Sequence, residues 1–318
     1  MAEEQRASIF FRLIEFFLLS VFYTTRLLVR ILPPSIAYAM FKCIGYTLYR
    51  SRSGMREHLL QNLGEALPGI DDPRELERIA KEACCAPFLP MLDMIVFKNH
   101  REHFLGELSV EGMEHLAAAD SEGKGVIVFS PHLGAFSVIT AAYTHLGKLY
   151  TPLVLPPSSS PVPRYVLSLA LYAQSLGCDR ENPAFLTGKD TIAKVREHLA
   201  KGKRVGITFD IEGDMVMDFF GRPTALASGI AHFAYDSGAP IVPSALLRGD
   251  SPLKCGLKIY EPLTYELSGD RSSDVKAILS EVVKSGEELI REAPEQWMGW
   301  FGLRHWRMRA DEMRKHED

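Results

Sequence analysis

The order of hydrophobic and polar residues divides the chain into a helical first third and a remainder in which strands alternate with helices. Residues 7–32 form the longest apolar stretch, and two consecutive prolines end it because proline cannot continue a helix. Residues 35–105 are predicted to be mostly helical. Within them, segments 55–67 and 74–96 carry apolar residues at helical spacing, with a turn at 69–73 between them.

The remainder of the chain shows continuous apolar runs that alternate with amphipathic segments. The predicted strands are 110–112, 125–130, 149–155, 204–209, 240–247 and 254–260. The predicted helices are 134–145, 164–176, 190–201, 227–237 and 274–292. Such a pattern is typical of parallel strands buried on both sides. We therefore expect an α/β fold with a mainly parallel central sheet flanked by helices.

The first apolar segment carries charges on one side. At about 100° per residue, its four charged residues Arg12, Glu15, Arg26 and Arg30 fall within a sector of about 60°. Its charge-free run spans 16–25, shorter than the roughly 20 residues that cross a bilayer. We expect an amphipathic helix at a membrane interface, with its charges toward headgroups or toward the rest of the protein. A tilted single span and a core helix of a soluble protein are the alternatives.

Composition and charge restrict the class of protein. A hydrophobic content of 47% in 318 residues excludes both a disordered chain and a polytopic membrane protein. The net charge of −4 argues against nucleic-acid binding. Residues 1–60 nevertheless hold eight Lys/Arg against four acids, an excess of four positive charges that suits an anionic lipid surface. Five scattered cysteines show no metal-binding spacing and indicate reduced thiols in the cytosol.

A histidine follows the first long buried strand. Strand 125–130 ends at Pro131, and His132 comes next, at the start of a predicted helix. Ligands of open α/β sheets bind at the carboxyl ends of the strands. A histidine there can act as a general base near neutral pH, or it can simply satisfy hydrogen bonds at a helix start.

Acidic residues follow the next buried strand. Asp210, Glu212 and Asp214 alternate around Gly213 after strand 204–209. Three such carboxylates can bind a metal, orient a histidine or face water, and the calcium-loop pattern is not completed. Further along, Arg222 stands near a predicted helix start, which is a natural site for an anion.

Taken together, these blocks resemble the glycerolipid acyltransferase superfamily, and more closely its lipid A lauroyl/myristoyl acyltransferase branch. The similar segments are the His-x4-acid block from His132, the acidic-Gly turn 209–213, the Phe-Gly-x-Pro segment 220–223, the Ile-Val-Pro strand 241–243, the Pro-Glu-Gln-Trp segment 294–297, and an early stretch with Arg56, Asn62-Leu63 and Pro68. Their order extends the resemblance from about residue 8 to 307.

The resemblance implies an acyltransferase of the inner membrane. It implies an N-terminal membrane anchor, an active site on the cytoplasmic face, a thioester donor on acyl carrier protein or coenzyme A, a lipid acceptor, and neither cofactor nor metal. His132 would take the acceptor's proton while an acid fixes the imidazole. The corresponding division is a membrane-associated helix 1–32, a helical lead-in 33–105, an acyltransferase domain 106–307 and a charged tail 308–318.

The sequence departs from the family pattern where the acid of the His-x4-acid block belongs. Ser137 stands there, and a hydroxyl cannot stabilise an imidazolium by charge. Three outcomes are open. Asp210 or Glu212 replaces the missing acid, the acceptor is an amine, or the chain is a weak or inactive relative that binds lipid or acyl chains.

Phosphate groups on the acceptor or on the donor's carrier require cations. Arg164, Arg180, Arg222 and Arg248 lie in predicted loops or at element ends on the expected active face, with Gly213 in the acidic-Gly turn. A guanidinium binds phosphate through two parallel hydrogen bonds. Other enzyme classes are disfavoured, since the sequence has neither the G-x-S-x-G elbow of serine hydrolases nor a P-loop.

Overall fold

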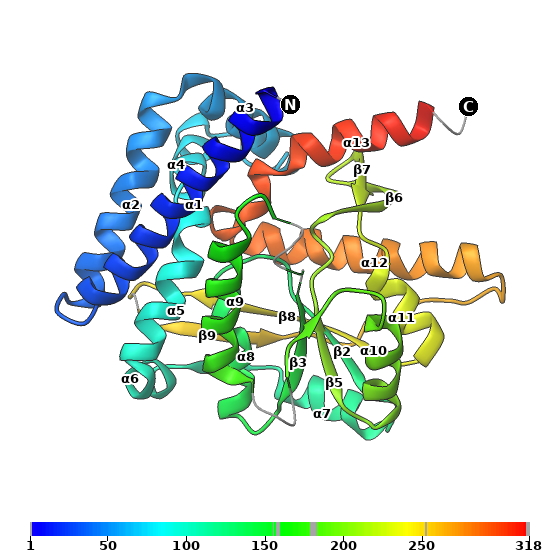
Figure 1. The fold of residues 1–318 in the computed structure, drawn as a ribbon. Coiled ribbons are helices and arrows are strands. Elements are labelled where there is room, and N and C mark those ends of the chain that lie inside the picture. The colour runs from blue at the N-terminus through cyan, green and yellow to red at the C-terminus, as the bar shows by residue number, and fades with distance from the viewer. Residues whose placement is uncertain (1, 155, 157–159, 179–182, 252, 316–318) are drawn as a thin grey trace.

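The computed structural model describes residues 2–154, 156, 160–178, 183–251 and 253–315. A seven-stranded sheet forms its centre, in the order β1-β9-β8-β2-β5-β3-β4 (Figure 1). Its strands are β1 (Ser109–Glu111), β2 (Val126–Phe129), β3 (Tyr150–Val154), β4 (Phe185–Leu186), β5 (Arg204–Ile207), β8 (Ile241–Arg248) and β9 (Cys255–Ile259). All neighbouring pairs are parallel except β8 and β9. The predicted mainly parallel sheet is confirmed.

Helices surround the sheet and also form most of the first hundred residues (Figure 1). The α-helices are α1 (Ala2–Leu28), α2 (Pro34–Ser51), α3 (Ser53–Ala66), α4 (Pro73–Ala83), α5 (Leu89–Asn99), α6 (Arg101–Gly106), α7 (Met113–Ser121), α8 (Ile139–His145), α9 (Pro163–Gly177), α10 (Thr191–Ala200), α11 (Gly229–Ser237), α12 (Arg271–Glu292) and α13 (Leu303–Lys315). The four-part division of the chain stays a prediction.

The central strand β2 is buried on both faces. Ile127 and Phe129 belong to one hydrophobic core with α10, α11 and α12, whereas Val126 and Val128 belong to another with α5, α8 and α9. The alternation follows from the pleat, which points successive side chains to opposite faces. Because β2 lies between β5 and β8, the loop after it opens at the middle of the sheet edge.

Three local predictions are wrong. Segment 74–96 is not one helix, because α4 ends at Ala83 and a 3₁₀ turn over Ala86–Phe88 precedes α5. The predicted helix 134–145 begins later, since Gly134 has a φ of +63° and pairs with Leu246. The region between Asp210 and Ala227 forms an antiparallel hairpin of β6 (Glu212–Phe219) and β7 (Arg222–Leu226) that the sequence pattern did not reveal.

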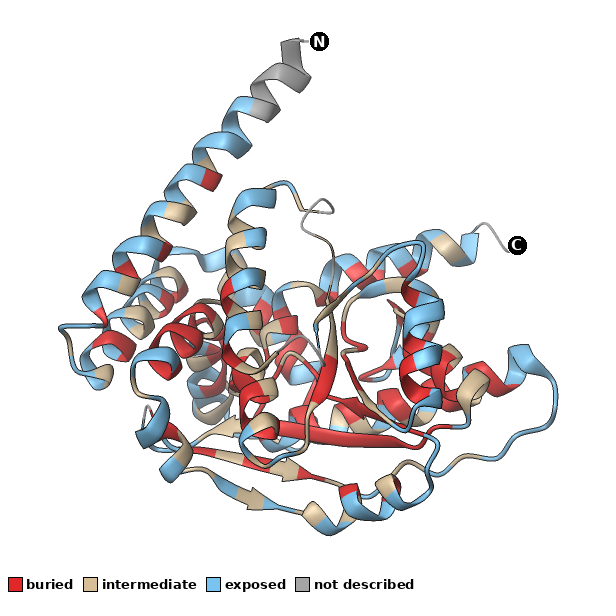
Figure 2. Ribbon diagram, turned by 60° about the horizontal axis from the view of Figure 1, so that its bottom comes forward, coloured by how far each residue is buried: buried red, intermediate tan, exposed pale blue. Residues whose placement is uncertain are grey.

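The charged side of helix α1 faces the protein. The Glu15 carboxylate accepts the backbone N–H of Arg164 at 2.6 Å, and the Arg26 guanidinium lies 4.9 Å from the centroid of the Tyr172 ring. The opposite side is exposed and apolar, with Leu13 and Phe17 each 65% exposed. Figure 2 shows α1 extending past the body of the molecule with most of its surface exposed. None of the helices in the described ranges is long and apolar enough to cross a membrane.

Candidate active site

His132 lies in the loop that follows the central strand. The Ser130 N–H donates to Ile207 on the neighbouring strand, and the N–H of Met298 donates to the His132 carbonyl at 3.2 Å. Gly134 closes the loop in the left-handed region, where a Cβ would come within 2.2 Å of the Leu246 carbonyl oxygen. Only glycine fits this approach without strain. The loop is therefore fixed against β5, β8 and the segment around Met298.

Asp210, three residues after the end of β5, is the partner of His132. Its side chain is fully buried, and Oδ1 lies 2.9 Å from the imidazole Nδ1. Oδ2 accepts the backbone N–H of His132 at 2.8 Å and the indole N–H of Trp297 at 2.8 Å. Buried carboxylates require such donors to offset the loss of hydration. Three N–H groups thus surround one acid.

The bond to Asp210 determines which imidazole nitrogen is available for chemistry. Because a carboxylate only accepts, Nδ1 must carry the proton, and the neutral ring then presents the lone pair of Nε2. Within the described part of the chain, Nε2 has no hydrogen-bond partner, and the side chain is 24% exposed. Burial by itself lowers the pKa of His132, but the charge and hydrogen bonds of Asp210 outweigh it and raise the pKa above its ordinary value.

The other candidates for the missing acid do not contact the imidazole. The Ser137 hydroxyl donates to the Pro90 carbonyl at 2.9 Å, on the helix beside the loop. The Glu212 carboxylate lies 2.7 Å from Nε2 of His305 on α13. Of the three acids after β5, Asp214 accepts the hydroxyl and N–H of Ser228. The structure therefore brings Asp210 alone of these groups to His132.

The predicted cations are spread over several elements. Arg248 is paired with the buried Asp93, with Nε 3.2 Å from Oδ2, while its buried Nη1 has no partner among the described groups. Arg222 pairs with Glu65 at 3.0 Å across the hairpin and α3. Arg180 lies outside the described residues.

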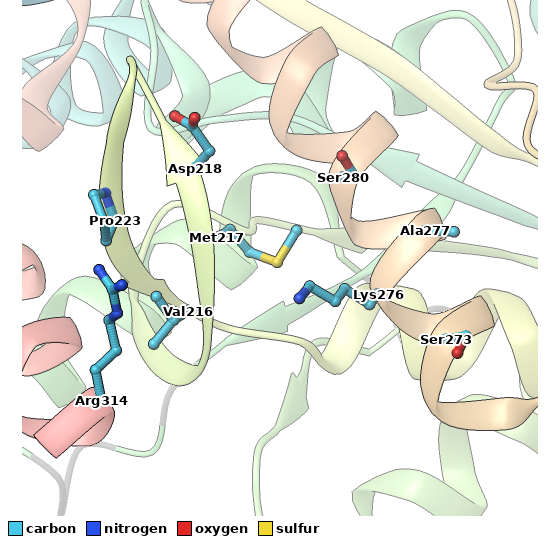
Figure 3. A pocket seen from close by; sticks show the side chains of 9 residues that line it. All are labelled: Val216, Met217, Asp218, Pro223, Ser273, Lys276, Ala277, Ser280 and Arg314. Carbon is cyan, nitrogen blue, oxygen red and sulfur yellow. The ribbon is translucent and has the colours of Figure 1, made fainter. Parts of the chain in front are cut away.

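Gly213 and Arg164 occupy two further places. A Cβ on Gly213 would lie 2.3 Å from the backbone of Ala227, so this glycine lets the two ends of the hairpin approach closely. Arg164 opens α9 and lines a surface pocket of about 650 Å³ with Arg12, Glu15 and apolar residues of α1. A second pocket, of about 640 Å³, lies between the hairpin, α12 and Arg314 of α13 (Figure 3). His132 lines neither of these two pockets.

The C-terminal part of the chain contributes contacts to the candidate site that the sequence pattern did not predict. The Gln296 side chain hydrogen-bonds both backbone groups of Arg248, at 2.9 and 3.0 Å. The backbone carbonyl of Gln296 accepts the Gly134 N–H. Trp297 reaches Asp210, as described above. The signal that could have found them was the Pro-Glu-Gln-Trp segment, which stood out only by resemblance.

Comparison with known proteins decides the family. The model of the bacterial lipid A biosynthesis acyltransferases matches residues 5–308, which is nearly the whole chain. The chain belongs to this family. It is also similar to a phosphatidylinositol mannoside acyltransferase of Mycolicibacterium smegmatis, with 26% identity over 280 residues that cover 85% of this chain and 86% of the relative. The chain is an acyltransferase of the class that acts on lipid-like acceptors.

Proposed function

We propose that this family member transfers a fatty acyl group from a thioester, on acyl carrier protein or coenzyme A, to a hydroxyl or amine of a lipid at the cytoplasmic face of the inner membrane. The observation that carries the proposal is the 2.9 Å contact of His132 Nδ1 with Asp210, which leaves Nε2 of this partly exposed side chain available. Such an imidazole meets the geometric requirement for a general base.

The chemical step requires one base that becomes an acid. Nε2 of His132 takes the proton of the acceptor hydroxyl as the oxygen attacks the thioester carbonyl. Asp210 stabilises the imidazolium that forms, since its charge faces Nδ1 across a hydrogen bond. When the carbon–sulfur bond breaks, the imidazolium returns the proton to the leaving thiolate. The proton taken from the acceptor hydroxyl thus ends on the leaving thiol, and these steps require no metal.

Two arginines are the better candidates for phosphate binding. Arg164 lines an open pocket beside α1, and Arg222 is 48% exposed at the side chain. Arg248 is turned toward Asp93, so its contribution is limited to the remaining N–H groups. Arg180 and Gly213 stay predictions for substrate contacts.

Loss of His132 tests the function. We expect His132→Gln to lower acyl transfer by about 10²–10⁴-fold, the usual contribution of a general base. His145→Gln, an exposed histidine on α8, is the matched control and should leave the rate unchanged. The assays offer thioesters of acyl carrier protein or of coenzyme A as donors and lipid extracts as acceptors. Alkaline hydrolysis then distinguishes ester products from amide products. Equal activity of His132→Gln and wild type would refute the base assignment, and acyl binding without turnover in wild type would favour an inactive lipid-binding relative.

The outward face of α1 supports attachment to a membrane surface. Its exposed apolar residues are Ile9, Phe10, Phe11, Leu13, Phe16, Phe17, Tyr23, Leu27 and Leu28. A row of this size on an amphipathic helix suits insertion among headgroups. Full burial of two phenylalanines is worth about 3 kcal/mol or more, so F16S/F17S should weaken binding to anionic vesicles by roughly 100-fold. Leu267→Ser and Met308→Ser remove apolar groups exposed elsewhere and serve as controls; equal binding of all variants would overturn the attachment.

A further inference from the structure

We propose that Trp297 is a positioning residue of the His132–Asp210 pair, holding the carboxylate in the orientation that directs the imidazole. The inference rests on the proposed function for its catalytic meaning, whereas the contact itself is a property of the folded protein. The indole N–H lies 2.8 Å from Oδ2 of Asp210, and Trp297 is completely buried.

The two carboxylate oxygens have different tasks. Oδ2 accepts two donors, the backbone N–H of His132 and the indole N–H of Trp297. Oδ1 is then left for the imidazole. Rotation of the carboxylate would break both bonds at Oδ2 at once. Without the indole, the hydrogen bonds that the Asp210 side chain keeps within the described residues both come from His132.

The Trp297 indole is held in place by tight aromatic packing. Its ring packs against Phe219, Phe220 and Trp300 with centroid separations of 5.7, 6.0 and 4.7 Å. A Cβ on Gly299 would come within 2.1 Å of the Trp297 ring, so the small residue makes room for it. A buried indole N–H needs a partner, because water cannot reach it. The packing therefore aims the N–H at Asp210.

The same segment also holds the backbone of the histidine loop. Leu133 and Trp297 form an antiparallel bridge, and the Met298 N–H donates to the His132 carbonyl. One stretch of chain thus fixes the base through its backbone and the acid through a side chain. This double contact distinguishes Trp297 from Trp300, whose indole N–H donates to the Pro294 carbonyl at 2.7 Å.

The tryptophan signals of the wild-type protein provide the test. The chain has three tryptophans, so a ¹⁵N–¹H spectrum resolves three indole N–H signals that single Trp→Phe variants assign. We expect the Trp297 signal to titrate with the apparent pKa of His132, since protonation of the imidazole redistributes charge on the shared carboxylate. The signals of Trp300 and Trp306 should not follow it, and the Trp297 titration should vanish in His132→Gln. A Trp297 signal that stays constant while the His132 ring titrates would overturn the proposal.

Kinetics then separate positioning from mere packing. Trp297→Phe keeps an aromatic ring but removes the donor to Asp210. The carboxylate then stabilises the imidazolium more strongly, which raises the pKa of His132. The acid limb of the kcat/KM profile should move to higher pH, with about a tenfold loss of kcat near pH 7 and little change in KM. Trp300→Phe removes an indole N–H from the same cluster and should keep the wild-type profile. Identical profiles for both variants would refute the role. The indole titration needs no turnover, so failure of acyl transfer and failure of this inference are distinguishable.

Discussion

Replacement of Asp210 by asparagine probes the pair most sharply, because the surrounding donors dictate how the amide must lie. At the position of Oδ2, two N–H groups, from the His132 backbone and Trp297, point at the side chain. An amide nitrogen there would face two donors, so the asparagine oxygen must occupy this place. Its NH₂ group then faces Nδ1 of His132.

This orientation reverses the imidazole tautomer. When the amide donates to Nδ1, the ring carries its proton on Nε2, and that nitrogen cannot accept a proton from the acceptor. The equivalent change in a serine-protease triad costs about 10⁴ in turnover for the same reason. We expect a loss of that order for Asp210→Asn. Buried hydrogen bonds to a charge become neutral ones, which we expect to lower the free energy of unfolding by about 1–3 kcal/mol.

The assay is single-turnover acyl transfer with saturating thioester, together with thermal unfolding of the same preparations. Glu212→Gln is the comparison, since Glu212 also follows β5 but its carboxylate faces His305 and not His132. We expect it to keep the rate within about twofold, as for a change at an exposed ion pair. The reasoning fails if Asp210→Asn retains a tenth of the wild-type rate, or if Glu212→Gln loses as much.

Three further predictions follow from contacts around the site. Ser137→Ala should lower the free energy of unfolding by about 1 kcal/mol with little change in rate, and Ser137→Asp should bring no rate gain, because its carboxylate would face the Pro90 carbonyl; rates and chemical denaturation of both variants check this. Because the pKa of His132 is raised in the folded protein, its pair with Asp210 stabilises the fold fully below the unfolded-state pKa, and this contribution is lost as pH rises through the folded-state pKa. The free energy of unfolding of wild type should therefore exceed that of His132→Gln by more at pH 5.5 than at pH 8.5. Arg248→Met should destabilise by about 3–5 kcal/mol in urea titrations, because it leaves the Asp93 charge buried and unpaired, and a variant as stable as wild type would contradict that account.

The sequence was most informative where elements are strongly apolar. Strands β2, β5 and β8 follow from continuous runs of buried residues, and their parallel arrangement follows from the intervening helices. The β6–β7 hairpin was not predicted, because acids and a proline interrupt the alternation of apolar and polar residues along its strands. Its tight turn also uses Phe220 at a φ of +52°, a conformation uncommon for that residue. Gly134 was predicted to begin a helix, because its local sequence does not show that it pairs with Leu246 on a strand distant in the chain.

The candidate site was predicted in part. The position of His132 after a central strand follows from local pattern, and Asp210 was one of two acids weighed as its partner. Local spacing could not choose between Asp210 and Glu212, because the choice depends on how the chain turns after β5 and on contacts 78 residues apart. Trp297 lies 87 residues from Asp210, so no periodicity connects them.

The bridge between the histidine loop and the segment after α12 also sets an order of events during synthesis. The Trp297 indole and the Met298 N–H are made late in translation, long after α1 has left the ribosome. A chain that ended at Glu292 would include every strand of the central sheet but would lack the two donors that complete the loop. The histidine loop can therefore be completed only after nearly the whole chain has been synthesised.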